Sequence, residues 1–452
     1  MRKKDRDGFM IVSAFSKTPL QNRFRTLLVI YFLIATLEVA NFHYISGISR
    51  IIVSMIIIVI SVLITIIFAK LKVEFNRSPF LSLQRYIHNN RLYEDEIRQI
   101  GFDRDGNPKQ KKVIFNSAYF SYKETENDLI VRSWKRADKF SDKANSQDTM
   151  LSALFGKELF RKQDNVQFCD YIFELVKDKR LSMNTRKPSK GMILQMTEKI
   201  SWSLGKPPHT LIVGSTNSGK TYLVSMLILD YLYMGADLFI ADPKSADLAI
   251  IGRIIDVKRY SKITNTATTE NEIAGLFRRA NEEMEKRYKE WFSDESAFGK
   301  TWRDIPTAKP LVFVFDEYSA FISVASPKIV KEVNGYLFNL ILKGRQAGIE
   351  VVMILQRPDA NILSANIRDQ FGVRIGLSNM TNDGRKMLFG SVDMEYKNIQ
   401  EIGSGYLLID GVFDKPVYFE TPLMSHGMDY LDELNKAIEE NKPKTITPLK
   451  VV

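Results

Sequence analysis

The sequence predicts an α/β protein whose main domain is a doubly wound, mainly parallel sheet. First, a phosphate-binding motif lies between an apolar strand and an amphipathic helix within residues 209–233. Second, Leu311–Glu317 is a run of five apolar residues followed by two carboxylates, as expected for a buried parallel strand that ends at a ligand site. Third, strand-like and helix-like segments alternate around these motifs, which is typical of α/β sheets. The further strand candidates are Leu238–Ala241, Glu350–Leu355 and Gly372–Leu377, and the helical ones are Glu270–Trp291 and Lys328–Lys343.

The composition is that of an ordinary globular protein. The chain has 452 residues, a net charge of +11, 45% hydrophobic and 26% charged residues. This length suits two or three folded units, and the composition excludes collagen-like, mucin-like and wholly disordered classes. The single cysteine, Cys169, excludes an internal disulfide and a cysteine-based zinc site, and it fits a reducing compartment.

Two apolar runs near the N-terminus predict a membrane anchor. Residues 51–69 carry no charge and are long enough to span a bilayer as a helix, whereas residues 26–42 form a shorter run that includes Glu38. We therefore expect a transmembrane hairpin over residues 26–77, with one span plus a buried core helix as the alternative. The basic residues of segment 1–25, and those after the second run, predict a multi-pass protein of the cell membrane with both termini and the motor domain in the cytoplasm.

The rest of the chain divides into three predicted parts. Residues 78–200 mix helical and strand-like patterns and are expected to form a small α+β adaptor, in which Leu83–Ile100 has helical spacing. Residues 201–425 contain the nucleotide motifs and form the expected ATPase domain. Residues 426–452 are expected to form a C-terminal helix and a tail. The basic excess lies in the first 200 residues, so the ATPase part is nearly neutral.

The phosphate-binding motif matches the pattern GxxxxGK[ST] in full and in the required strand-loop-helix context. Glycines allow backbone N–H groups to surround phosphate oxygens, and the N-terminus of the following helix attracts negative charge. Lys220 is expected to reach the β- and γ-phosphates, and the Thr221 hydroxyl to bind Mg²⁺. The predicted ATP-binding residues are Gly214, Ser215, Thr216, Asn217, Ser218, Gly219, Lys220 and Thr221.

Polar residues at strand ends complete the predicted site. Asp316 is expected beside the phosphate loop, where it would hold Mg²⁺ together with Thr221, and Glu317 is expected to polarise the attacking water. Gln356 also follows a strand and could contact the γ-phosphate, although a role as a strand-end cap is an equal alternative. These positions predict an ATPase that uses ATP and Mg²⁺.

The ordered motifs resemble those of a known family. The strings PHTLIVGSTNSGKT, DPKSADL, LVFVFDE and GRQAGIEVVMILQRP, with the spacing between them, are similar to the motor domain of the FtsK/SpoIIIE family of RecA-like DNA translocases, over roughly Ser201–Phe419. The resemblance implies a RecA-like motor domain, a homohexameric ring that hydrolyses ATP at its subunit interfaces, and DNA as the partner in its centre. It also implies that Arg345 is an arginine finger acting on the neighbouring subunit, and that Arg357 and Arg368 belong to a DNA-contacting pore loop. A surface ion pair is the alternative for each arginine.

Within this family, the chain resembles the short FtsK-like coupling proteins of Gram-positive conjugative plasmids and integrative elements. The sequence ends soon after the motor and shows no winged-helix domain that would read DNA sequence. The expected function is therefore a membrane-anchored DNA translocase for conjugative transfer, with a relaxase and conjugative channel proteins as partners. Alternatives are a partition translocase for chromosomes or plasmids, a motor ATPase of a type VII-like protein secretion system, and a receptor that uses ATP only to assemble.

Overall fold

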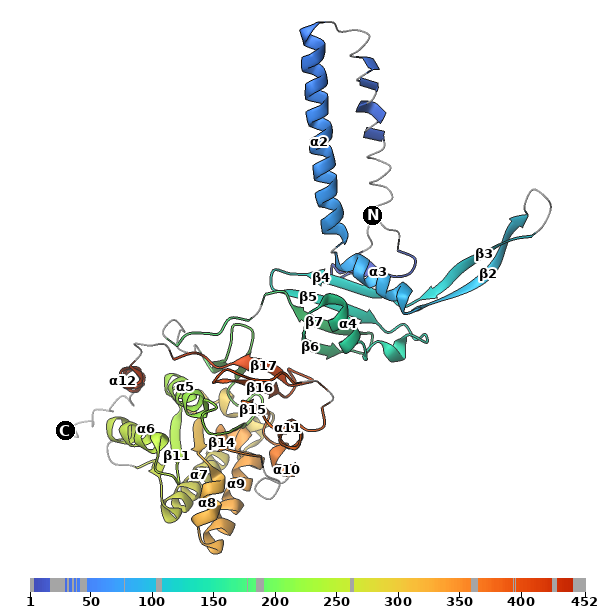
Figure 1. Cartoon of the computed structure of the whole chain (residues 1–452). Helices are drawn as coiled ribbons and strands as arrows, with labels where there is room; N and C mark the ends of the chain where they lie inside the picture. The colour runs from blue at the N-terminus through green and yellow to red at the C-terminus, as the bar shows by residue number, and fades with distance from the viewer. Residues whose placement is uncertain are drawn as a thin grey trace. The chain divides into compact units, whose positions relative to one another are not determined.

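The structure is a computed structural model of the whole chain. It describes the chain except residues 1–3, 17–28, 31, 35, 38, 41–46, 77, 103–107, 177, 184–190, 261–263, 359–364, 393, 395, 425–428 and 442–452. The chain folds into two compact units, Met1–Lys177 and Asp178–Val452, each with its own sheet (Figure 1).

The first unit is built on a five-stranded antiparallel sheet with the strand order β1-β4-β5-β7-β6. Helix α3 packs against β1, β4 and α4. Leu83 and Ile87 of α3 are fully buried with Val131 and Phe173 of the sheet, and together they form the core of this unit. The elements are β1 (Met10–Val12), α3 (Pro79–Asn89), β4 (Phe120–Glu124), β5 (Asp128–Trp134), α4 (Asp148–Phe155), β6 (Leu159–Asp164) and β7 (Phe168–Glu174).

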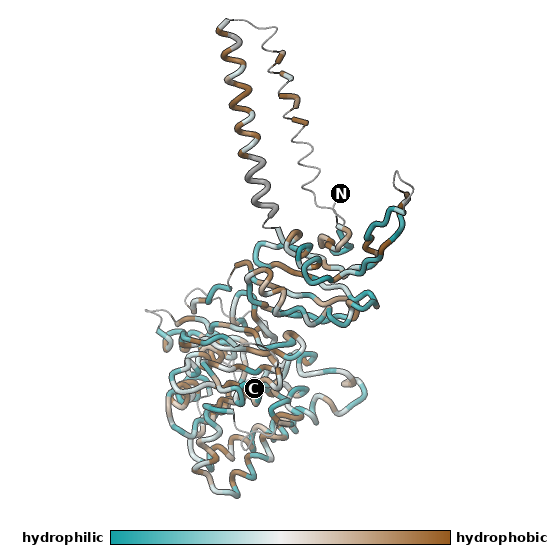
Figure 2. Tube along the Cα trace, turned by 45° about the vertical axis from the view of Figure 1, so that its right-hand side comes forward, coloured by the Kyte–Doolittle hydropathy of each residue, from teal (hydrophilic) through white to brown (hydrophobic). Residues whose placement is uncertain are grey.

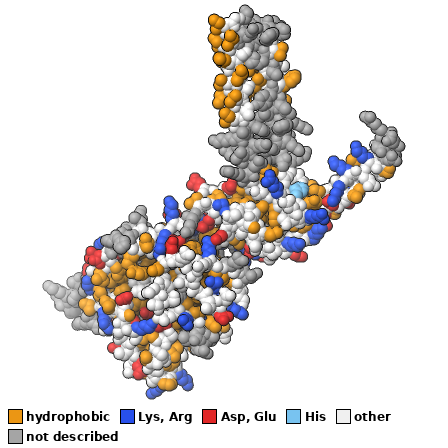
Figure 3. All heavy atoms as spheres, in the orientation of Figure 1, with side chains coloured by type: hydrophobic (Ala, Val, Ile, Leu, Met, Phe, Trp, Pro, Cys, Tyr) orange, Lys and Arg blue, Asp and Glu red, His pale blue; other side chains and the backbone are white. Residues whose placement is uncertain are grey.

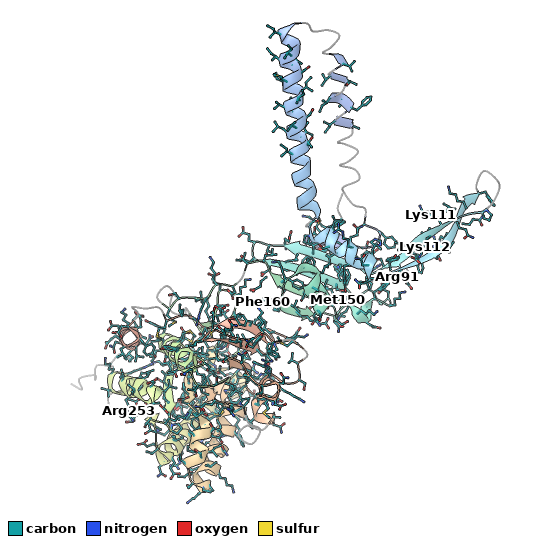
Figure 4. The ribbon with its side chains drawn as sticks, viewed as in Figure 1. Arg91, Lys111, Lys112, Met150, Phe160 and Arg253 are labelled. Carbon is teal, nitrogen blue, oxygen red and sulfur yellow. The ribbon has the colours of Figure 1, made fainter. Side chains whose placement is uncertain are left out.

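A long hairpin extends from this unit (Figure 1). It consists of the antiparallel strands β2 (Tyr93–Phe102) and β3 (Pro108–Ser117), most of whose residues are exposed. Figure 4 shows Lys111 and Lys112 on β3. The segment 83–100, predicted to be helical, is therefore divided: α3 ends at Asn89, and the following residues pair with β3.

The apolar helix α2 (Ile48–Asn76) is the part of the chain that led to the prediction of a membrane anchor. Figure 2 colours part of its trace as hydrophobic, Figure 3 shows hydrophobic side chains on its surface, and Ile51, Met55 and Ile66 are more than half exposed. Even so, across the described residues no helix is both long enough and apolar enough to cross a membrane.

This finding contradicts the predicted multi-pass localisation and the two-helix anchor. A transmembrane helix needs about 20 consecutive apolar residues. The side chains of α2 are described continuously only over residues 51–66, and residues 26–28, 31, 35, 38, 41 and 42 of the predicted first span, 26–42, lie outside the described residues. Membrane anchoring is therefore withdrawn from the functional assignment.

The second unit contains an eight-stranded sheet with the order β12-β11-β13-β14-β10-β15-β16-β17. The first six strands run parallel, and the last two are antiparallel to their neighbours. The predicted doubly wound, mainly parallel sheet is thus confirmed. Its strands are β10 (Thr210–Gly214), β11 (Asp237–Ala241), β12 (Thr266–Ala267), β13 (Leu311–Phe315), β14 (Ile349–Leu355), β15 (Val373–Leu377), β16 (Ser404–Ile409) and β17 (Val417–Glu420), and a separate two-stranded sheet joins β8 (Ile193–Gln195) and β9 (Ser201–Ser203).

Helices pack against this sheet in two groups (Figure 1). Helices α5 and α12 pack together, as do α7 and α9. The rings of Phe277 on α7 and Phe313 on β13 stack with centroids 4.1 Å apart, and every residue of β13 and β14 is buried. The helices are α5 (Lys220–Tyr233), α6 (Asp247–Ile255), α7 (Glu270–Trp291), α8 (Tyr318–Val324), α9 (Pro327–Ala347), α10 (Ala365–Arg368), α11 (Asn382–Phe389) and α12 (Tyr430–Glu440). With the strands buried, the ends of the parallel strands are where polar side chains can gather.

Candidate nucleotide site

The phosphate loop joins the end of β10 to the start of α5. Gly219, which precedes the helix, has φ of +94°, a conformation that favours glycine. The Lys220 ammonium donates to the carbonyl oxygens of Gly214 and Ser215, the latter at 3.1 Å. Burial lowers the pKa of Lys220, while Glu317 and Asp316 act in the opposite direction. The loop thus holds a partly desolvated cation at the end of β10. Phosphate oxygens could replace the loop carbonyls as acceptors for the Lys220 ammonium.

Two glycines of the loop are required by close packing. A Cβ at Gly214 would lie 2.6 Å from the Ser218 Oγ and 3.0 Å from the Leu377 Cβ. A Cβ at Gly219 would lie 2.9 Å from the Cα of Gly403. Neighbouring residues of this unit therefore leave no room for a side chain at either glycine of the motif, with or without a bound phosphate.

The acidic pair Asp316–Glu317 follows β13, at the same edge of the sheet as the phosphate loop. The strand order places β14 between β13 and β10, so the pair lies one strand away from the phosphate-loop strand. Burial raises the pKa of Asp316, and the positive charge of Lys220 opposes this rise, so the two charges lie within electrostatic reach. As a consequence, Gln356, directly after β14, enters the site between the loop and the acidic pair.

Glu317 is held in place from several directions. It is 4% exposed and adopts φ of +49°, an unusual conformation for a residue with a side chain. Its carboxylate accepts from the Ser319 hydroxyl and, at 3.3 Å, from the backbone N–H of Gln356. Its other oxygen lies 3.5 Å from the Lys244 Nζ. The carboxylate predicted to polarise water is therefore fixed at the carboxyl edge of the sheet.

Lys244 is a site residue that the sequence reasoning did not assign. It lies in the DPKSADL motif after β11. A cation in a turn at the end of a strand is the sequence feature that could have identified it as a site residue. The carboxylate of buried Asp242 organises this turn, since it accepts from the backbone N–H groups of Lys244 (3.0 Å), Ala246 (2.8 Å) and Ala249 (3.0 Å). Asp242 thus has a structural role and Lys244 contacts Glu317.

Asp316 lies in surroundings that favour a cation. Burial, the charge of Asp242 and that of Glu317 raise the pKa of Asp316 to about 6. Among the described residues no group of three or more His, Cys, Asp or Glu side chains is arranged to hold a metal. Mg²⁺ generally takes few protein ligands and is held largely by water and phosphate oxygens. If Mg²⁺ were bound, Asp316 and Thr221 would offer the hard oxygen atoms that this ion prefers.

Asp316→Asn is expected to stabilise the nucleotide-free protein at pH 8 by up to about 3 kcal/mol. The pKa of Asp316 is higher in the folded protein than in the unfolded chain, so folding loses stability as the pH rises from about 4 to about 6. The gain should therefore shrink as the pH falls below about 6. Urea unfolding at pH 5 and pH 8 measures it, with Asp414→Asn on an exposed turn as the control. A gain that did not change between these pH values would contradict the assigned environment.

Arg345 lies at the opposite edge of the sheet. It is exposed near the end of α9, and its charge, after burial, helps to lower the pKa of His209 to about 4. His209 precedes β10, whereas the phosphate loop follows that strand, and five residues of strand span about 16 Å. The structure therefore does not bring Arg345 to the phosphate loop of its own chain.

The two arginines predicted to contact DNA have different surroundings. Arg357 is exposed and follows Gln356 directly at the end of β14. Arg368 ends α10, and its Nη2 lies 3.0 Å from Oδ1 of Asp369. Residues 359–364, between them, lie outside the described residues. Arg357 is thus next to the nucleotide site, and Arg368 is paired with a neighbouring carboxylate.

The profile of the FtsK/SpoIIIE family matches residues 186–383. The Ftsk domain-containing protein YdcQ of Bacillus subtilis (strain 168) is 32% identical over 374 residues, which cover 79% of this chain and 72% of that protein. The chain belongs to the FtsK/SpoIIIE family. The resemblance predicted from the motifs is confirmed, and this FtsK-family chain is an ATP-hydrolysing motor ATPase.

Other matches are shorter or more distant. The DNA translocase FtsK of Caldanaerobacter subterraneus subsp. tengcongensis is 26% identical over 259 residues, which cover 55% of this FtsK-family chain and 34% of that protein. This chain thus spans about a third of the translocase it matches. The solved structure of the pCW3 conjugation coupling protein TcpA, a monomer with ATPγS, aligns with a TM-score of 0.49 and 17% identity, covering 72% of this chain and 94% of that one.

Proposed function

We propose that this FtsK-family ATPase is a DNA translocase. The observation that best supports this proposal is the link between the arginine predicted to contact DNA and the catalytic carboxylate. The backbone N–H of Gln356 donates to Glu317, and Arg357 is the next residue in the chain. A DNA phosphate that moved Arg357 would therefore act on the hydrogen bond that positions Glu317.

The site residues divide the chemistry of ATP hydrolysis among them. Lys220 leaves the loop carbonyls to neutralise the β- and γ-phosphates, and Glu317 orients the attacking water. Bound Mg²⁺, held by Thr221 and Asp316, would supply charge neutralisation at the phosphates. Lys244 restrains Glu317 until the γ-phosphate competes for the lysine. Arg345 completes the site of a neighbouring subunit in a proposed homohexameric ring.

The charge distribution supports a local grip on DNA. The second unit is nearly neutral, so it must concentrate positive charge where a polyanion passes. Arg357 and Arg368 flank the segment after β14 and would meet phosphates without reading sequence.

A more specific proposal is that the DNA belongs to a conjugative element and is delivered with its relaxase to channel proteins. This proposal is based on the sequence resemblance to coupling proteins, and transfer of the element from donor cells tests it.

Replacing Arg357 and Arg368 together with Ala is expected to bring the ratio of ATP turnover with DNA to turnover without DNA close to one. Each lost phosphate contact should also reduce the slope of the logarithm of the DNA-binding constant against the logarithm of salt concentration by about one. Turnover is measured with single- and double-stranded DNA, and Arg253→Ala, an exposed arginine on α6 (Figure 4), is the control.

Full stimulation of the double variant would refute the pore role of the two arginines. If neither form of DNA stimulated the unaltered protein, the translocase proposal would fail, and a protein-export motor would become the better candidate.

A further inference from the structure

The strand order determines which way a bound nucleotide would lie across the ends of the strands. The carboxylates of Asp316 and Glu317 lie on the β13 side of the phosphate-loop strand β10. Because Glu317 acts on the γ-phosphate, the γ-phosphate end of ATP must point toward β13. The nucleoside must then extend toward the other side of β10, where β15, β16 and β17 lie.

A turn before β16 contacts the phosphate loop on that side. The backbone N–H of Gly403 donates to the Ser218 carbonyl at 3.0 Å. The Cγ2 of Ile402 lies 3.4 Å from the place where a Cβ at Gly219 would be, so this side chain contacts the last glycine of the loop. Ile402 is nevertheless 63% exposed. It therefore presents apolar surface directly beside the phosphate position, on the side opposite Glu317.

Arg180 holds this turn in place. Its Nε donates to the Thr421 carbonyl at 2.7 Å, and its Nη2 donates to the Ile402 carbonyl at 3.1 Å. The N–H of Thr421 in turn donates to the Gly403 carbonyl at 2.8 Å. These hydrogen bonds tie the turn to the end of β17 and to Arg180. Arg180, Ile402 and Thr421 all lie outside the segment that the family profile matches.

We propose that Ile402 forms an apolar contact for the nucleoside of ATP and ADP, and that Arg180 is its positioning residue. The faces of a purine and of a ribose are largely apolar, so they gain by covering an exposed aliphatic side chain. This inference rests on the ATP chemistry of the proposed function but not on DNA. The proposed contact is with the nucleoside, which inorganic phosphates lack.

Calorimetric titration of the full chain, with Mg²⁺, separates the nucleoside from the phosphates. Ile402→Ser is expected to weaken ADP binding about tenfold and to leave inorganic tripolyphosphate binding unchanged. Ile402→Leu, which keeps the apolar volume, should bind ADP nearly as the unaltered protein does. Val412→Ser, at the opposite end of the same β16–β17 hairpin, is the control for an exposed apolar residue.

Unchanged ADP binding in Ile402→Ser would refute the contact, and so would an equal loss for ADP and tripolyphosphate, which would indicate a damaged phosphate loop. Arg180→Ala should also weaken ADP binding and add little when combined with Ile402→Ser. If the two variants weakened ADP binding additively, Arg180 would not act by positioning Ile402. These titrations contain no DNA, so a failure of DNA to stimulate turnover would leave this inference standing and refute only the translocase.

Discussion

Replacing Glu317 with Gln is expected to slow ATP hydrolysis by about a hundredfold to ten-thousandfold and to leave ATP bound on the protein. Glutamine keeps the size of the side chain and can still accept from the Ser319 hydroxyl and from the Gln356 N–H, but it cannot take a proton from water. The loss should therefore appear in kcat and not in nucleotide affinity.

Phosphate release and retention of labelled ATP are measured on the same preparations. Lys220→Ala is the contrasting variant, because removing the cation that meets the phosphates should abolish hydrolysis and weaken ATP binding as well. Glu332→Gln is the control. Glu332 lies on α9, and its carboxylate pairs with Arg278 of α7. Undiminished turnover of Glu317→Gln would show that another group orients the water.

Replacing Arg345 with Ala is expected to lower turnover about a thousandfold or more, and mixing with Lys220→Ala subunits should restore part of it. The restored interfaces would combine the intact phosphate loop of one variant with the intact arginine of the other. The reason is geometric: Arg345 lies near His209 at the start of β10, while the phosphate loop lies at the end of that strand.

The experiment measures ATP turnover across mixing ratios, with subunit exchange followed separately. Lys343→Ala, an exposed cation two residues before Arg345, should keep turnover close to that of the unaltered protein. If rings that demonstrably mix show no recovery, Arg345 does not act in trans.

Part of the fold could be predicted because its signals are local. The loop glycines, Lys220 and the buried run before Asp316 lie within short windows, and hydrophobic periodicity marks α7 and α9. The membrane prediction was equally local, and the finding on the described helices contradicts it. The helix predicted over Leu83–Ile100 was wrong beyond Asn89, because residues from Tyr93 onward pair with β3, and helical spacing cannot report a partner strand.

By itself, the sequence determined the family, the ATP-binding loop, the acidic pair and the class of sheet. The tertiary structure alone decided that β14 separates the acidic pair from the phosphate loop, that Lys244 reaches Glu317, and that Arg345 lies at the far edge. It also brought Arg180, Ile402 and Thr421 together across more than 200 positions. Strand order and such long-range contacts depend on how distant segments bury their apolar faces against one another, and no local pattern of residue types encodes which segments become neighbours.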